Sequence, residues 1–267
     1  MYTAFASVYD QLMADVDYLT WARFYHALME CYGVGRGKVC ECACGTGSIT
    51  IHLSQMGYQM TGVDISPDML FEASQKARKS GAMIPFVKQD MRSLHLHRSM
   101  DAVLCTNDGV NYLKDAGELT QFFRAAYLAV REGGALLMDL STPYKLEHIL
   151  GNHFIGDETP EIAYLWQNRY SRSQQCVDLN LAVFVRQKDE TYLRIGEHQR
   201  QYAHSAKLIT ELLQGVGFTD IRVFADKKLE EPSPRELRWF IGARKPLARE
   251  SGEGAEAYAE AVPATEI

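Results

Sequence analysis

Apolar positions recur at two spacings along the chain, and the change of spacing divides it into segments. Residues 5–32 carry apolar side chains every three or four positions, which predicts two helices, the second capped by Thr20. From residue 38 to residue 150, short runs of Val, Ile, Leu and Cys alternate with helical patterns. Such alternation is typical of a parallel sheet that helices cover on both faces.

The same pattern returns near the end of the chain, so that seven strands are expected in one sheet. We predict strands at 38–43, 59–64, 84–88, 100–106, 135–140, 218–225 and 237–243. We predict helices at 48–56, 67–79, 119–130 and 205–215, with a weaker one at 144–150. The fold class is therefore α/β, with a Rossmann-like, mostly parallel seven-stranded sheet.

Residues 151–204 interrupt this alternation. The segments 161–171, 175–187 and 191–204 read as three strands with short links and no helix between them. Successive strands joined in this way pair antiparallel. We therefore expect a three-strand antiparallel insertion at 151–204 in an α/β core formed by 35–150 and 205–247.

Composition and charge narrow the class of protein. The chain is 46% hydrophobic and 23% charged, as in ordinary globular proteins. Its net charge is −6, and four acidic residues lie in the last 17 positions, within an expected disordered acidic tail at 248–267. The remainder is nearly neutral and lacks the basic surplus that neutralises phosphates, which argues against nucleic acid as a partner.

The same survey predicts a cytoplasmic protein. No apolar run approaches the ~20 residues that span a bilayer, and no basic segment precedes an apolar core as in a signal peptide. Six cysteines are too few for a disulfide scaffold. Cys40, Cys42 and Cys44 lack the spacing and the second ligand pair of a zinc site, so we expect small buried strand residues and no metal.

The clearest chemical signal is a glycine turn at the end of the first core strand. Residues 39–47 read VCECACGTG and lead into a helix at Ser48. Glycine lets the backbone approach a ligand closely, and open α/β sheets bind ligands at the carboxyl ends of their strands. Asp64 ends the second strand, where a carboxylate can accept two hydrogen bonds from a ribose diol, and Asp90 follows the third.

Two cofactor sites compete for this pattern. A dinucleotide fingerprint requires a third glycine where this chain has Thr50. Over residues 35–245 the chain more closely resembles the class I S-adenosylmethionine-dependent methyltransferases. Their first motif is matched by Glu41, Ala43, Gly45 and Gly47, with Ala43 in place of the usual first glycine.

The resemblance implies roles for the strand-end residues. Asp64 would hold the ribose hydroxyls, Asp90 the adenine amino group, Ile65 and Met91 the two sides of the ring, and Asn107 the methionine end. The segment Val8-Tyr9-Asp10 and the insertion resemble small-molecule members, notably bacterial sugar-amine and glycine N-methyltransferases. This implies an N-terminal helical lid at 1–34, with Tyr9 at the cofactor, and an insertion that helps to form the acceptor pocket.

The last strand of the insertion is polar on both faces from Glu197 to Gln201. One interpretation is a solvated edge strand, charged to deter pairing with another sheet. The other is an acceptor pocket lined by His198, Arg200 and Tyr202, which share one face. His198, Tyr202 and His204 are then the candidate general bases, if the acceptor arrives protonated.

The function expected is in-line methyl transfer from S-adenosylmethionine to a small-molecule N or O nucleophile. Residues 106–112, TNDGVNY, lack the prolines with which DNA and RNA amino-methyltransferases clamp a base. Two alternatives stay open: a methyltransferase of protein or RNA that docks on the insertion, and a cofactor-binding regulator without catalysis. The edges of the insertion could also pair two subunits into a homodimer.

Overall fold

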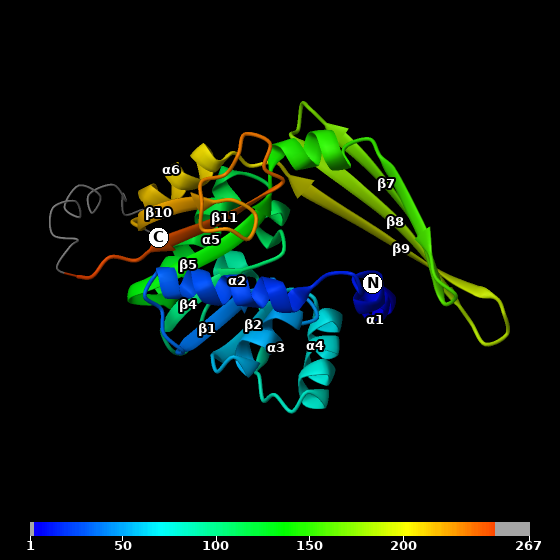
Figure 1. Ribbon diagram of the computed structural model, residues 1–267, viewed down its shortest axis with the longest axis horizontal. Helices are drawn as coiled ribbons and strands as arrows, with labels where there is room; N and C mark the ends of the chain where they lie inside the picture. The colour runs from blue at the N-terminus through cyan, green and yellow to red at the C-terminus, as the bar shows by residue number, and fades with distance from the viewer. Residues whose placement is uncertain (1–2, 249–267) are drawn as a thin grey trace, which may run out of the picture.

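The computed structural model describes residues 3–248, and its main body is built on a seven-stranded sheet (Figure 1). The strand order is β10-β11-β5-β4-β1-β2-β3, and among the described neighbours only the pairs that include β11 are antiparallel. This confirms the mostly parallel sheet. The strands are β1 Lys38–Cys42, β2 Gln59–Asp64, β3 Phe86–Lys88, β4 Met100–Cys105, β5 Val130–Ser141, β10 Thr219–Phe224 and β11 Arg238–Arg244.

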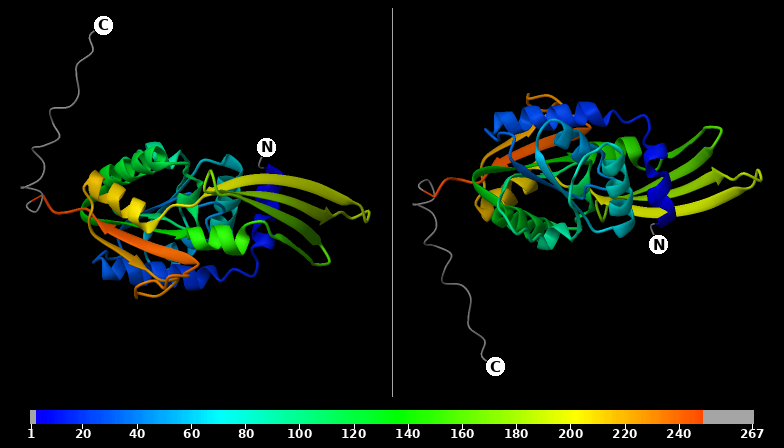
Figure 2. Two further views of the ribbon diagram at one scale, coloured as in Figure 1. Left: turned by 90° about the horizontal axis from the view of Figure 1, so that it is seen from above. Right: turned by 90° about the horizontal axis from the view of Figure 1, so that it is seen from below.

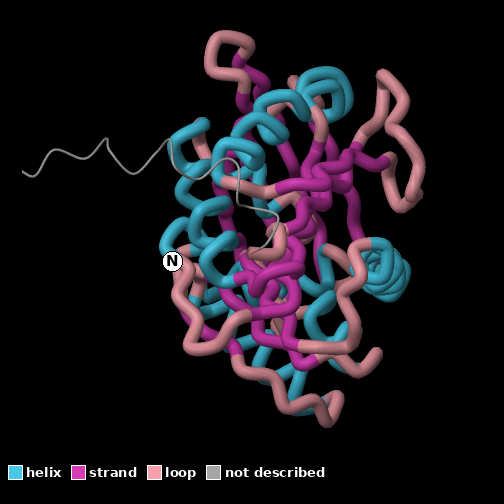
Figure 3. The backbone as a smooth tube through the Cα atoms, turned by 90° about the vertical axis from the view of Figure 1, so that its left-hand side faces the viewer, coloured by secondary structure: helices cyan, strands magenta, loops and turns pink. Residues whose placement is uncertain are grey.

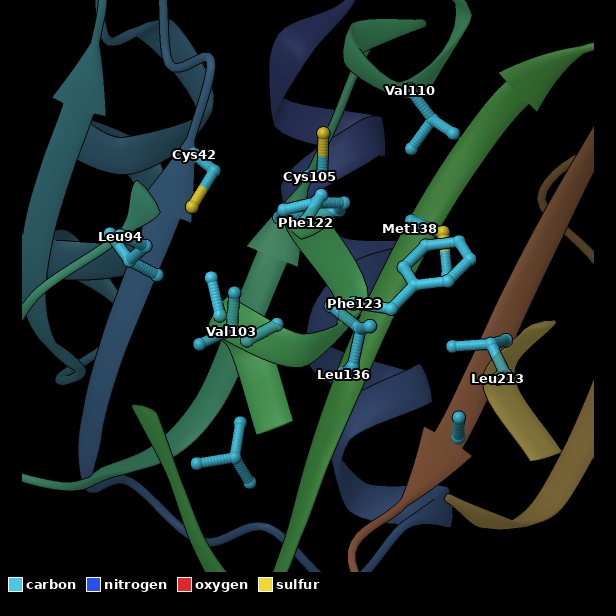
Figure 4. Close-up of a cluster of buried hydrophobic side chains, with 14 of the residues drawn as sticks. Cys42, Leu94, Val103, Cys105, Val110, Phe122, Phe123, Leu136, Met138 and Leu213 are labelled. Atoms are coloured by element: carbon cyan, nitrogen blue, oxygen red, sulfur yellow. The ribbon is translucent and has the colours of Figure 1, made fainter. Parts of the chain in front are cut away.

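Helices cover both faces of this sheet (Figure 3). On one face α2 (Tyr18–Cys31) and α3 (Ser48–Gln55) pack on apolar side chains of the strands, among them Leu104 and Leu137. On the other face α5 (Ala116–Ala129) and α6 (Ala206–Val216) pack on Val103, Leu136 and Met138 (Figure 4). Because neighbouring strand residues point to opposite faces, two covered faces explain the uninterrupted apolar runs of β4 and β5. The remaining crossover helix, α4 (Pro67–Lys79), packs against β2 and β3.

The two N-terminal helices pack in different places. α2 begins after Asp17, whose carboxylate accepts hydrogen bonds from the backbone N–H of Thr20 at 3.0 Å and from its hydroxyl at 2.6 Å. Asp17 is therefore the N-cap, and the predicted Thr20 cap is wrong by one turn. Whereas α2 belongs to the core, α1 (Thr3–Leu12) packs on a second, smaller sheet.

This small sheet extends from one end of the body (Figure 2). It has four antiparallel strands in chain order: β6 (Phe154–Glu158), β7 (Ile162–Ser171), β8 (Cys176–Arg186) and β9 (Tyr192–Tyr202). The predicted insertion is confirmed, but its count of three strands is wrong. All five residues of β6 are exposed, so this strand has no apolar alternation from which to recognise it.

One face of the small sheet is covered at both ends. Near the β8–β9 turn, Phe5 and Val8 of α1 pack with Val183 and neighbouring apolar residues. At the opposite end, Leu146 from a π-helical turn at Lys145–Leu150 packs on Val177 and Leu179. The rows of side chains between these two contacts face the main body.

The structure also bears on the predictions for the cysteines and for a membrane-spanning helix. Cys40, Cys42 and Cys44 are free and buried, as predicted. Within residues 3–248, no helix combines the length and the apolar character needed to cross a bilayer. The predicted tail falls, from residue 249 onward, outside the described residues.

Gly62 on β2 lies under the ring of Phe86 on β3. A Cβ at this glycine would stand 2.4 Å from Phe86 Cδ1 and 3.0 Å from Cys44 Sγ. We therefore expect Gly62→Ala to lower the free energy of unfolding by roughly 1–3 kcal/mol, as other overpacked cores do. Urea unfolding measures the loss, and it should shrink when Gly62→Ala is combined with Phe86→Ala. Equal losses in both backgrounds would contradict the close approach.

Candidate active site

A cavity of about 720 Å³ lies where the carboxyl ends of β1, β2 and β4 meet α1 and the small sheet. The chain leaves β1 toward β2 and later returns to form β4 on the other side of β1. The crevice between β1 and β4 is therefore the switch point at which open α/β sheets bind ligands. Volumes of roughly 300–1,000 Å³ are usual for cofactor and small-molecule sites.

The glycine turn after β1 forms the floor of this cavity. Ala43, Gly45 and Gly47 all have positive φ, of +53°, +53° and +73°. The N–H of Gly45 donates to Asp64 Oδ2 at 2.9 Å, and the N–H of Ser66 donates to Oδ1 at 2.8 Å. These bonds fix the Asp64 carboxylate at the end of β2. Burial raises the pKa of Asp64, and the backbone N–H donors oppose that shift.

Glu41 lies beneath the turn and is fully buried. Its carboxylate accepts hydrogen bonds from the hydroxyl of Thr50 on α3 and, at 2.5 Å, from the hydroxyl of Thr106 after β4. Burial raises the pKa of Glu41 to about 7, against the effect of both hydroxyls. Through these two hydrogen bonds, the Glu41 side chain links β1 to α3 and to the end of β4.

The wall beside Asp64 is apolar at two points and charged at a third. Ile65 and Met91 line the cavity, and 62% of Ile65 is exposed. Asp90 also lines it, but Arg92 binds both of its carboxylate oxygens, through Nε at 3.0 Å and Nη2 at 2.6 Å. The backbone N–H of Arg92 donates to Asp90 as well, so this carboxylate retains little free hydrogen-bonding capacity.

The loop after β4 is held by a buried carboxylate. Asn107 and Asp108 are both left-handed, with φ of +50° and +67°. Asp139 on β5 accepts the N–H of Asn107 at 2.7 Å on Oδ1 and the N–H of Asp108 at 3.1 Å on Oδ2. Tyr25 on α2 donates its hydroxyl to the same Oδ1 at 2.6 Å. Two successive left-handed residues thus bind one carboxylate.

Two cations balance the negative charge around this loop. Arg238 on β11 pairs with both Asp108 and Asp139, and Lys145 donates to Ser141 Oγ at 3.0 Å, which in turn donates to Asp108. Burial opposes ionisation, yet Arg238 and Lys145 hold the pKa of Asp108 below its usual range. Burial lowers the pKa of Lys145. Sequence reasoning missed this cluster, although Asp139 and Arg238 stand out as charges inside apolar strands.

Tyrosines form the roof of the cavity. Tyr9 on α1 lies over Asn107, whose Nδ2 donates to its hydroxyl at 3.5 Å. Tyr18 and Tyr112 line the same space, and the hydroxyl of Tyr112 donates to Gln199 at 2.7 Å. Burial raises the pKa of all three phenols above its usual value.

The face of β9 that lies toward the cavity is the opposite of the one that the sequence predicts. Glu197, Gln199 and Gln201 line the cavity, whereas His198 and Arg200 point to the opposite face. There both pair with Asp178, at 3.5 Å and 2.6 Å. The prediction that these two side chains line an acceptor pocket is therefore wrong, because a strand that is polar on both faces gives no alternation to orient it.

The other two candidate bases differ from each other. Tyr202 shares the strand face of Arg200, but it is the last residue of β9, where the strand meets the main body, and it borders the cavity. His204 is buried outside it and shares a hydrogen bond with the carbonyl of Leu113 at 2.8 Å. Burial lowers the pKa of His204, so the ring is neutral and donates to that carbonyl. Of the three residues predicted as bases, only Tyr202 lies at the cavity.

Comparison with known proteins identifies the family. A model described as "Methyltransferase domain" matches residues 39–134. YqeM of Bacillus subtilis (strain 168), whose name places it with the methyltransferases, is 32% identical over 246 residues, 92% of this chain and 97% of its own. This chain belongs to the S-adenosylmethionine-dependent methyltransferases.

A solved structure and a second relative extend the comparison. The crystal structure of an S-adenosylmethionine-dependent methyltransferase from Clostridium acetobutylicum ATCC 824 has a TM-score of 0.83 and 28% identity, and covers 92% of this methyltransferase and 99% of that chain. Glycine/sarcosine N-methyltransferase of Aphanothece halophytica is 26% identical over 194 residues, 72% of this chain and 70% of its own. The cofactor of this methyltransferase is S-adenosylmethionine.

The lining of the cavity suits that cofactor. An added Cβ at Gly45 would meet no atom within 4 Å, so the turn is open where a ligand would lie against it. Asp64 offers carboxylate oxygens for hydroxyl groups, and the neighbouring Ile65 and Met91 offer apolar surface for a flat ring. An adenosine group requires a hydrogen-bond acceptor for its ribose hydroxyls and, beside it, apolar surface for its ring.

A polar tether joins α1 of the methyltransferase to the glycine turn. Asp10 accepts a hydrogen bond from Thr46 Oγ1 at 2.6 Å and pairs with Lys76 of α4 at 2.5 Å. Lys76 also donates to Thr46 at 3.0 Å and to Ser48 at 2.9 Å. The helix that carries Tyr9 is thereby fixed to the loop beneath the cavity.

We expect Lys76→Ala to loosen α1 and weaken S-adenosylmethionine binding by up to about five-fold, because a partly exposed ion pair contributes at most about 1 kcal/mol. Titration calorimetry measures the affinity. Asp10→Asn should have a similar effect, and the double variant should lose little more than either single one. Lys79→Ala, an exposed lysine on the same helix, is the control. Full additivity of the two substitutions would contradict the tether.

The raised pKa of Glu41 predicts a pH-dependent stability. In the folded state Glu41 keeps a proton that an exposed glutamate releases near pH 4.5. This proton binding contributes its full share to the free energy of unfolding below pH 4.5, and the contribution is lost as the pH rises through about 7. Relative to Glu41→Gln, the wild type should lose about 3 kcal/mol of unfolding free energy across this window. Urea unfolding at several pH values gives this difference, with Glu190→Gln on an exposed turn as control. A pH-independent difference would refute the shift.

Proposed function

We propose that this methyltransferase transfers the methyl group of S-adenosylmethionine to an N or O nucleophile of a small molecule. The observation that carries the proposal is that the cavity is covered: α1 and the small sheet stand over the strand ends, and side chains from both line it. Such a space suits a cofactor with a small acceptor better than a macromolecular surface. The relationship to glycine/sarcosine N-methyltransferase supports the same class of acceptor.

In this proposal the residues of the floor bind the cofactor. Asp64 accepts hydrogen bonds from the ribose hydroxyls, and Ile65 and Met91 pack on the two sides of the adenine ring. Gly45 and Gly47 let the backbone approach the ligand, while Glu41 supports their turn from below. Asp90 serves the adenine amino group only to the extent that Arg92 leaves a carboxylate oxygen free.

The residues around Asn107 orient the reacting end. Asn107 and Tyr9, joined by their hydrogen bond, border the methionine end of the cofactor, and Asp139 keeps the Asn107 backbone in its left-handed turn. S-adenosylmethionine supplies a methyl group on a sulfonium, already reactive toward a nucleophile in line with the C–S bond. Good orientation of reacting groups supplies roughly 7–11 kcal/mol of a reaction barrier, which is the main task left to the protein. The helix α1 covers one side of the cavity.

A general base is required only if the acceptor arrives protonated. His198 and His204 lie outside the cavity and are not proposed for this step. Of the predicted bases, Tyr202 at the end of β9 remains the candidate.

Asp64→Ala should weaken S-adenosylmethionine binding about ten- to a hundred-fold, because a hydrogen bond to a charged group contributes about 1.5–3 kcal/mol. Titration calorimetry measures the affinity, with Asp157→Ala on the exposed strand β6 as the control. Unchanged affinity in Asp64→Ala would remove this residue from the cofactor site.

The acceptor class is tested with S-adenosylmethionine labelled in the methyl group. We expect the wild type to label compounds in the low-molecular-weight filtrate of a bacterial lysate. Label found only in retained protein or RNA would replace the small-molecule proposal with a macromolecular one. Tight cofactor binding without transfer to either pool would indicate a regulator instead.

A further inference from the structure

Buried polar side chains without a hydrogen-bond partner gather on the small sheet. Among residues 3–248, five buried side-chain N or O atoms have none, and four of them belong to Trp166, Asn168 and Glu197 on β7 and β9. Such atoms are rare in folded proteins, and each costs about 1–3 kcal/mol. Their concentration on one sheet indicates groups that a ligand satisfies.

The strand register places two of these side chains in one row. Trp166 on β7 is opposite Leu181 on β8, and Leu181 is opposite Glu197 on β9, so all three point to the same face. Adjacent strands lie 4.7–4.9 Å apart, which separates the backbones of the outer two by about 10 Å. Asn168 belongs to the next row, opposite Leu179.

This row faces the cavity. Trp166, Leu181 and Glu197 all line it, together with Leu179 and Gln199 of the next row. The face is closed toward the β8–β9 turn by α1 and toward the other end by the π-helical turn at Lys145–Leu150. An indole N–H, an apolar centre and a carboxylate therefore face the same space as the residues proposed to bind the cofactor.

Three described cationic side chains line the cavity, those of Arg92, Lys114 and Lys145, and none of them forms an ion pair with Glu197. Its Oε1 is buried and receives no hydrogen bond from any described residue. Arg92 on the cavity wall is paired with Asp90 and Glu118, and Lys145 is engaged at Ser141 beside Asp108. Burial raises the pKa of Glu197, and the neighbouring Gln199 side chain opposes this shift. A ligand that brought a positive charge would compensate this half-buried carboxylate.

Trp166 requires the opposite kind of group. Indole Nε1–H is a donor only, so a ligand atom that satisfies it must be a hydrogen-bond acceptor. The apolar side chain of Leu181 separates this donor from the carboxylate. The complementary molecule is short, with a cationic donor at one end, an accepting oxygen or nitrogen at the other, and carbon between.

We propose that Trp166 and Glu197 form the acceptor subsite and select a small molecule that carries an ammonium group, bound by Glu197, and a hydrogen-bond acceptor, bound by Trp166. This inference rests on the proposed function and narrows its substrate class. Neither residue is assigned a part in the transfer step, so both are specificity-determining residues.

The first test asks what charge the acceptor carries. The low-molecular-weight filtrate of a bacterial lysate is passed over a strong cation exchanger in dilute strong acid, where carboxyl groups are protonated and every amine is retained as a cation, and each eluted fraction is neutralised and assayed with labelled S-adenosylmethionine. Acceptor activity in the retained, cationic fraction is the expected result. Activity confined to the flow-through would overturn the inference while leaving the proposed function intact. A wild type that labels no fraction would overturn both.

The second test compares two matched carboxylate-to-amide variants of the same hairpin. Glu197→Gln should raise the apparent KM for the retained fraction, measured by dilution, about ten-fold or more, because a hydrogen bond to a charged group is lost. The rate at saturation and the calorimetric affinity for S-adenosylmethionine should stay near wild type. Glu190→Gln, in the exposed β8–β9 turn, should change neither value.

A Trp166→Phe variant tests the other end, where loss of a neutral hydrogen bond should raise the same KM about two- to ten-fold. Thermal unfolding of each variant checks that it is folded. If Glu197→Gln leaves the KM for the acceptor as unchanged as Glu190→Gln does, while the enzyme is active, Glu197 does not bind the acceptor and the inference is overturned. If the affinity for S-adenosylmethionine falls while KM for the acceptor is unchanged, Glu197 belongs to the cofactor site, which also overturns the inference.

Discussion

The bond between the Asp139 carboxylate and two successive backbone N–H groups holds the centre of this structure. Asn107 and Asp108 adopt left-handed conformations that ordinary residues avoid, and Asp139 stabilises the turn by accepting from both. A carboxylate buried on a central strand is itself costly unless it is paired. Arg238 supplies the charge, and removing one partner of such a pair typically costs about 3–5 kcal/mol.

This requirement links distant parts of the sheet. Arg238 is the first residue of β11, which runs antiparallel beside β5 and brings the guanidinium next to Asp139. The last segment of the core thereby reaches the loop after β4, and Tyr25 reaches the same carboxylate from α2. The cavity floor is fixed by elements from both ends of the described chain, whereas its roof rests on α1 and the tether of Asp10 to Lys76.

The sequence was sufficient where burial imposes a pattern. Alternating apolar strands and helices predict the seven-stranded sheet, and the positions of Gly45 and Asp64 at strand ends follow from it. Where burial imposes no pattern, prediction failed. The wholly exposed β6 has no apolar alternation that would predict it. Because β9 is polar on both faces, its sequence does not show which face lies toward the cavity, and it points to His198 where the structure places Glu197. The cluster around Asp139 depends on strand order, which spacing along the chain does not reveal.

The cavity takes its two walls from sheets that have separate apolar cores. The floor stands on the large clusters of the main sheet, while Trp166, Leu181 and Glu197 stand on a small sheet stabilised by its own contacts with α1 and the π-helical turn. A substitution in the middle rows of the small sheet therefore leaves the main core untouched. Such an arrangement allows one wall to diversify during evolution, or in the laboratory, without loss of the other.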